Sequence, residues 1–185
     1  MENKISKCHR INPYLKKPEN QLLLPENSNR IRRLAVKSFY FRSYLFWNLP
    51  MGFLSGMRIK KLNKDQCIVS VPFKWINKNP FKSTFWAVLG MAGEMSTAAL
   101  ILQYTYKQIP SFSTLPLKCE ADFNKKAVGI TSFICNDGKM VKKKLKDAIE
   151  KKKPVVIKTF TQGIDKNSNV ICEFNFTWSV KARDY

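Results

Sequence analysis

One long segment, residues 83–106, constrains the fold more than any other part of this sequence. It has the sequence STFWAVLGMAGEMSTAALILQYTY, and its single charge is the carboxylate of Glu94 at its centre. Such a segment predicts a helix that is apolar all round and is therefore enclosed by the rest of the protein. Burying an ionised carboxylate without partners is costly, so Glu94 must have a partner or a chemical task. We take Glu94 as the leading candidate site residue.

A membrane span is the alternative interpretation of this segment, since about twenty apolar residues suffice to cross a bilayer. Glu94 would then lie at mid-depth, among the small or hydroxylated residues Gly90, Gly93, Ser96 and Thr97. Ionisable groups are unfavourable at that depth. We therefore expect no transmembrane segment and favour a helix wrapped by a sheet.

Composition predicts one folded domain with a polar extension. A chain of 185 residues with 44% hydrophobic residues is long enough to form a sizeable core, and no linker divides it. Residues 1–28 are polar and contain Pro13, Pro18 and Pro25, so we expect an N-terminal arm there. Residues 29–185 then form the single domain.

The positive charge of the chain restricts its partners to a few classes. Lys and Arg number 33 and Asp and Glu 13, which gives a formal net charge of +20. This charge attracts phosphates, whether in nucleic acid, an anionic membrane or a nucleotide-bearing small molecule. Charge alone does not choose among these partners.

Cysteine and histidine usage argues against metal and disulfide chemistry. The five cysteines are widely spaced without a CxxC pair, and the single histidine, His9, lies beside Cys8 in the predicted arm. We expect no metal site, no disulfide framework and no mechanism that needs a histidine base in the core. The first residues do not resemble a secretion signal, so the reduced cytoplasm is the expected compartment.

Hydrophobic spacing and turn residues predict the remaining elements. The first half has a helix over 30–49 ended by Pro50 and Gly52, and a hairpin of strands 57–62 and 66–73. Ser83 or Thr84 is the expected N-cap of the long helix, which should end near Pro110. The second half has strands 115–123 and 128–135, a helix within 139–153, and a hairpin of strands 154–161 and 170–180. This order predicts an α+β fold in which an antiparallel sheet covers the long helix.

The predicted order resembles the hotdog fold, and in particular its acyl-CoA thioesterase superfamily, over residues 30–182. Two motifs carry this resemblance. The first motif consists of Asn79, the helix start at residues 83–86 and Glu94. It is similar to the phenylacetate-pathway type of hotdog thioesterase, which has an Asn, a His-Gly-Gly turn that opens the helix, and an Asp or Glu about two helical turns further in. Residues 123–129, FNKKAVG, are similar to the family pattern F-x-[KR]-P-A-x-G.

The sequence departs from both motifs. Aligning on Glu94 places Phe85, Trp86 and Ala87 where the family has His-Gly-Gly, and Lys126 replaces the usual proline. Bulk at Phe85 and Trp86 lies where a thioester carbonyl would approach the helix start.

The resemblance implies hydrolysis of an acyl thioester, with Glu94 as general base or nucleophile and Asn79 or Ser83 orienting water or the carbonyl. CoA would enter as part of the substrate, with no further cofactor. The resemblance also implies a site between two protomers, in a homodimer or a dimer of dimers. The expected substrate-binding residues are Thr84, Phe85, Trp86, Thr97, Lys125 and Lys126, of which the two lysines would pair with CoA phosphates.

Two other functions remain open. A non-catalytic hotdog protein that binds an acyl chain or a CoA conjugate would explain the loss of His-Gly-Gly. A basic protein that binds nucleic acid or a membrane surface would explain the net charge. We expect no specific nucleic-acid partner, and we interpret the lysines at 142–153 as a solvated helix face.

Overall fold

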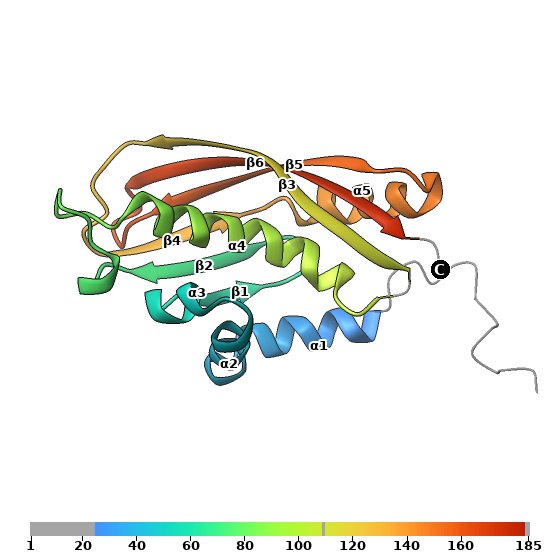
Figure 1. Ribbon diagram of the computed structural model, residues 1–185, viewed down its shortest axis with the longest axis horizontal. Helices are drawn as coiled ribbons and strands as arrows, with labels where there is room; N and C mark the ends of the chain where they lie inside the picture. The colour runs from blue at the N-terminus through green and yellow to red at the C-terminus, as the bar shows by residue number, and fades with distance from the viewer. Residues whose placement is uncertain (1–24, 109, 184–185) are drawn as a thin grey trace, which may run out of the picture.

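The computed structural model describes residues 25–108 and 110–183, which form a six-stranded sheet with a long helix packed against it (Figure 1). Six strands, five α-helices and one 3-10 helix follow one another along this part of the chain. In order they are α1 Pro25–Ala35, α2 Ser38–Asn48, α3 Pro50–Ser55, β1 Arg58–Leu62, β2 Cys67–Pro72, η2 Trp75–Asn77, α4 Trp86–Thr105, β3 Ser111–Phe123, β4 Ile130–Cys135, α5 Gly138–Lys151, β5 Val155–Ile164 and β6 Val170–Arg183.

The sheet has the strand order β1-β2-β4-β5-β6-β3, and every neighbouring pair is antiparallel. Both predicted hairpins are confirmed, as β1 with β2 and β5 with β6. The two strands around the loop at 124–127 do not pair with each other. β3 pairs with β6 at one edge of the sheet, whereas β4 lies between β2 and β5.

Helix α4 fills the centre of the fold and contacts β1, β2, β4, β5 and β6 (Figure 1). Inward residues alternate along β6, where Phe174, Phe176 and Trp178 form a buried aromatic row. Gly93 lets α4 approach this row closely, since a Cβ there would lie 3.3 Å from the ring of Phe174. The predicted α+β class, with an antiparallel sheet covering the long helix, is confirmed.

The prediction of a single helix over residues 30–49 is wrong. The chain forms α1 and α2, which are separated by Val36 and Lys37, and Pro50 begins α3 instead of ending a helix. Proline is well tolerated in a first helical turn because it needs no N–H partner there and its φ is already helical. Gly52 consequently lies inside α3, where it is buried.

The predicted arm is described only at its end. Residues 1–24, including Cys8 and His9, lie outside the described residues, and the four residues after them belong to α1. Within residues 25–108 and 110–183, no helix is long and apolar enough to cross a membrane. The same residues contain no cluster of metal-ligating side chains.

Candidate active site

Helix α4 begins one to two residues later than predicted and lacks a side-chain cap. Its N-cap residue is Phe85, so the prediction of Ser83 or Thr84 is wrong. Both hydroxyls instead join the chain before α4 to the loop after β3. The Ser83 Oγ accepts the N–H of Ala127 at 2.9 Å, and the Thr84 Oγ1 donates to the Ala127 carbonyl at 3.0 Å.

The uncapped start of α4 leaves two backbone donors available. Among the described residues, the N–H groups of Trp86 and Ala87 have no acceptor, while those of Val88 and Leu89 both donate to the Phe85 carbonyl at 2.9 and 3.2 Å. The helix dipole adds partial positive charge at this end. A negatively charged oxygen could therefore bind here.

Buried Asn77, which the sequence did not single out, fixes the approach to α4. Its Nδ2 donates to the carbonyls of Ser55 and Pro72 at 2.8 and 2.7 Å, and its own carbonyl accepts the Phe85 N–H at 2.7 Å. These bonds hold the loop before α4 against α3 and β2. The residues around Asn77 form no recognisable sequence motif, so the sequence does not predict this role.

Asn79 shapes the turn before α4. Its Oδ1 accepts the N–H groups of Phe81 and Ser83, both at 3.1 Å, and its N–H donates to the Ser83 carbonyl at 2.8 Å. The Nδ2 of Asn79 has no acceptor among the described residues. It is therefore still able to donate to a ligand.

A pocket of about 350 Å³ lies beside the start of α4 and gathers six of the nine predicted site residues. Lys125 stands at this pocket with its Nζ bonded to the Asn169 Oδ1 at 3.0 Å. Sequence reasoning missed three lining residues, although two of them belong to the motif at 123–129. The pocket is lined by Asn79, Ser83, Thr84, Trp86, Leu89, Phe123, Asn124, Lys125 and Lys126.

Glu94 is half-buried on α4 and unpartnered. Its carboxylate makes no hydrogen bond or ion pair with any described residue. Burial raises the pKa of Glu94 above its ordinary value of 4.5. Burial, followed by the nearby Glu94 charge, raises the pKa of the Cys119 thiol, which belongs to β3. An unpaired acid of this kind is a candidate general base.

Three predicted residues do not line the pocket. Phe85 lies beside it and is exposed. Thr97 is fully buried, and its hydroxyl donates to the backbone carbonyl of Glu94 at 2.9 Å. Glu94 lies eight residues beyond Trp86, or about 12 Å along the helix axis. The acid and the uncapped helix start of one chain are therefore separate.

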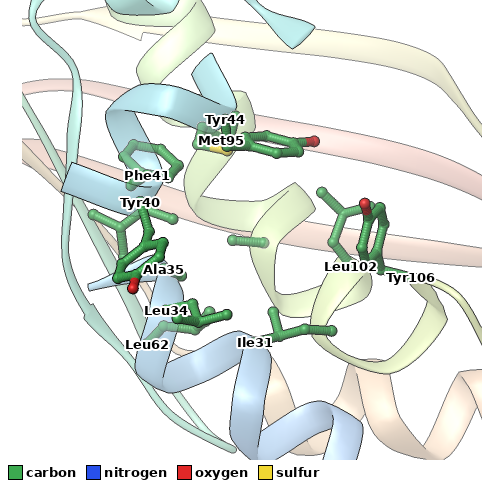
Figure 2. A pocket seen from close by; sticks show the side chains of 12 residues that line it. Ile31, Leu34, Ala35, Tyr40, Phe41, Tyr44, Leu62, Met95, Leu102 and Tyr106 are labelled. Carbon is green, nitrogen blue, oxygen red and sulfur yellow. The ribbon is translucent and has the colours of Figure 1, made fainter. Parts of the chain in front are cut away.

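A second cavity of about 250 Å³ lies between α1, α2, β1 and α4 (Figure 2). Its walls are almost entirely aliphatic and aromatic, and Figure 2 shows Ile31 and Leu34 of α1 facing it together with Leu102 of α4 and Tyr106 just after α4. None of its lining residues is charged. Sequence reasoning missed this cavity because the spacing of α1 predicts only a buried face.

Comparison with known proteins supports the fold. No protein-family model and no curated protein matches this sequence. Solved structures do match. A Pseudomonas aeruginosa protein described as a probable thioesterase is 16% identical with a TM-score of 0.66, and the match covers 84% of this chain and 96% of that one. A thioesterase from Haemophilus influenzae is 12% identical with a TM-score of 0.58, covering 80% and 95%.

The PaaI protein from the phenylacetic acid degradation operon of Escherichia coli is 11% identical with a TM-score of 0.55, covering 78% of this chain and 94% of that one. At these identities the matches show the fold. The chain has the hotdog fold, and thioesterases are among the proteins that share it.

Proposed function

We propose that this protein is a thioesterase that hydrolyses acyl-CoA or a related acyl thioester, with Glu94 as general base or nucleophile. The observation that carries the proposal is the half-buried Glu94 carboxylate, which has a raised pKa and no protein partner among the described residues. Such a group remains free to act on water or a carbonyl near neutral pH. The hotdog fold shared with thioesterases supports the same reaction class.

A site shared by two copies of the chain would bring Glu94 close to the start of an α4 helix, although the two are far apart within one chain. About 12 Å along α4 is too far for one thioester carbonyl to contact both Glu94 and the N–H of Trp86. In a homodimer with antiparallel α4 helices, Glu94 of one copy would face the α4 start of the other. We therefore place each site between two protomers.

Strand β3 is the element that would pair in this dimer. It is an edge strand of 13 residues, exposed along most of its length, and Leu115 and Leu117 are 59% and 55% exposed. A long edge strand with unpaired backbone groups is a template for another strand. Pairing β3 of two copies would also bring the second copy near Glu94, whose charge acts on Cys119 of β3.

The reaction follows from these groups. Glu94 takes a proton from water while the water oxygen bonds to the thioester carbon, and the resulting oxyanion accepts the N–H groups of Trp86 and Ala87. The carbon–sulfur bond then breaks, and the thiolate takes the proton from Glu94, which gives a carboxylic acid and free CoA. Lys125 and Lys126 would pair with CoA phosphates.

The test is thiol release from a panel of acyl-CoAs between acetyl and palmitoyl. We expect release with at least one chain length, loss of release in Glu94→Ala, and no change in Glu150→Ala, which removes an exposed acid on α5. Release by Glu94→Ala at the wild-type rate, or no release by the wild type with any substrate, would contradict the proposal.

A second experiment tests whether the site is shared. Trp86→Pro removes the N–H while proline fits the first helical turn, and Trp86→Ala keeps the N–H as its control. We expect Trp86→Pro and Glu94→Ala to be inactive alone. Refolded as an equal mixture, they should recover about a quarter of wild-type turnover, since half of the dimers are mixed and each has one intact site. If the mixture recovers no turnover, Glu94 and the N–H of Trp86 act within the same chain.

Non-catalytic binding of an acyl chain or a CoA conjugate is the second candidate. Trp86 is 60% exposed at the pocket and aligns with a glycine of the His-Gly-Gly turn of the similar thioesterases. Its side chain lies where a thioester carbonyl would approach the helix start, and this favours a bound ligand over turnover. A non-hydrolysable acyl-CoA thioether should then bind with an affinity that falls in Lys125→Ala/Lys126→Ala, without thiol release from acyl-CoA.

A further inference from the structure

Helices α2 and α3 carry an exposed aromatic face that the proposed thioesterase site does not use. We define the aromatic face as Phe39, Tyr40, Phe46, Trp47, Met51 and Leu54, all of which are exposed. Phe39 and Trp47 are 78% and 80% exposed, although large aromatic side chains usually bury most of their surface. A contiguous exposed apolar surface of this kind marks an interaction site.

The face is preorganised by contacts among its rings. Phe46 meets Trp47 and Phe53 edge to face, with ring centroids 5.1 and 5.4 Å apart, and Phe39 meets Tyr40 at 5.8 Å. Only Phe41 and Leu45 of α2 are buried against the rest of the protein. Most of the exposed side chains of α2 are therefore aromatic although they face solvent.

Positive charge is placed directly on this face. The Arg42 guanidinium lies 4.3 Å from the centre of the Phe53 ring, and the Lys37 ammonium lies 6.0 Å from that of Tyr40. Arg58 donates to the hydroxyl of Ser38, the first residue of α2, at 3.0 Å. These three cations have no carboxylate partner among the described residues. Residues 27–64 contain nine Lys and Arg and no Asp or Glu.

We propose that the aromatic face docks on the surface of an anionic lipid bilayer. Aromatic rings with one polar end are favoured in the interfacial layer, and Lys and Arg beside them pair with lipid phosphates. The positive charge of Lys37, Arg42 and Arg58 complements the negative charge of such a bilayer, and this favours the bilayer as the partner. A second copy would bring its own Lys37, Arg42 and Arg58 to the same contact, and like charges at a closing interface oppose association.

The shape of the face also distinguishes a bilayer from nucleic acid. Single-stranded nucleic acid binds in a basic groove where rings stack on bases. Met51 and Leu54 offer no stacking surface, and the cavity beside α2 that Tyr40 helps to line has no charged residue in its walls, so it is not a basic groove. Apolar side chains projecting from a helix pair instead match insertion into a lipid interface.

The position of the face leaves it free in the proposed dimer. Helix α2 contacts β1, which forms one edge of the sheet, whereas β3 forms the other. Figure 1 shows α2 projecting on the β1 side of the molecule, away from β3 and β6. Docking through α2 therefore does not require β3 to be unpaired, and it holds whether or not the protein hydrolyses thioesters.

The experiment is co-sedimentation with vesicles of two parts phosphatidylcholine and one part phosphatidylserine, compared with pure phosphatidylcholine. We expect the wild type to bind the mixed vesicles and Phe39→Ser/Trp47→Ser to bind at least about tenfold more weakly. Val156→Ser/Phe160→Ser is the control, because Val156 and Phe160 are 49% and 43% exposed on β5, away from α2 and α3, and it should bind as the wild type does.

Charge variants provide a second comparison that does not depend on the aromatic pair. Lys37→Glu/Arg58→Glu should weaken binding more than Lys142→Glu/Lys143→Glu, which changes charge equally on exposed positions of α5. Circular dichroism and thermal unfolding establish that each variant is folded.

Three results would overturn the proposal. The first is no vesicle binding by the wild type, or equal loss in face and control variants. The second is binding that vanishes at high salt and is indifferent to Phe39 and Trp47. The third is a face variant that binds vesicles as the wild type does but differs from it in oligomeric state or in its binding of single-stranded DNA.

Discussion

Replacing Glu94 by glutamine should lower thioester turnover at least about a hundredfold while making the folded protein more stable. Glutamine keeps the shape of the side chain but can neither take a proton from water nor attack a carbonyl. Its effect on stability has the opposite sign because burial disfavours the ionised carboxylate of Glu94. An acid retained for its chemistry at the expense of stability shows this combination, whereas a structural acid loses stability when it is replaced.

The pH dependence gives the sign of each effect. The pKa of Glu94 is raised in the folded state, so the contribution of this group to stability is full below its unfolded pKa and is lost as pH rises through the folded pKa. Glutamine should therefore raise Tm at neutral pH and have little effect below the ordinary value of 4.5. Wild-type turnover should rise with pH through a pKa above that value.

Thermal unfolding at neutral and acid pH, together with thiol release on the same samples, measures both effects. Each kcal/mol shifts Tm by roughly 2–4 °C in a chain of this size. Glu150→Gln is the control, since this acid is exposed on α5 and no shift of Tm or turnover is expected. A lower Tm for Glu94→Gln at neutral pH would show instead that the carboxylate has a stabilising partner.

Local signals in the sequence were sufficient for the elements that position the site. Helix α4 follows from an uninterrupted apolar segment, and the two hairpins follow from alternating residues around polar turns. The break between α1 and α2 has no such signal, because the residues on either side of it keep helical spacing. Pro50 was misinterpreted because proline both ends helices and begins them.

The parts that could not be predicted depend on contacts between distant residues. β3 pairs with β6 rather than with the next strand, which depends on the packing of the whole sheet and not on the loop between β3 and β4. The Ser83 and Thr84 hydroxyls were expected to cap α4, but both bond Ala127, more than forty residues away. The separation of Glu94 from the helix start became meaningful only once Trp86 was known to begin the helix.

Replacing Gly138 by alanine should be among the most destabilising single substitutions in this protein. A Cβ at this position would lie 2.1 Å from the Lys64 carbonyl oxygen and 2.7 Å from the Cα of Asp65. Both are backbone atoms, so no side chain can rotate to make room. The Gly138 N–H also donates to the Asp65 carbonyl at 3.0 Å, which joins the start of α5 to the turn between β1 and β2.

The start of α5 cannot move away easily, because the Oδ2 of the preceding Asp137 accepts the N–H of Phe160 at 2.7 Å. Overpacking of this kind costs about 1–3 kcal/mol, and we expect a fall in Tm of roughly 2–12 °C in thermal unfolding. Gly129→Ala is the matched control, since nothing lies within 4 Å of where its Cβ would be, and it should leave Tm nearly unchanged. Equal effects of the two substitutions would mean that the α5 start and the β1–β2 turn are not packed backbone against backbone, because only that contact distinguishes the two glycines.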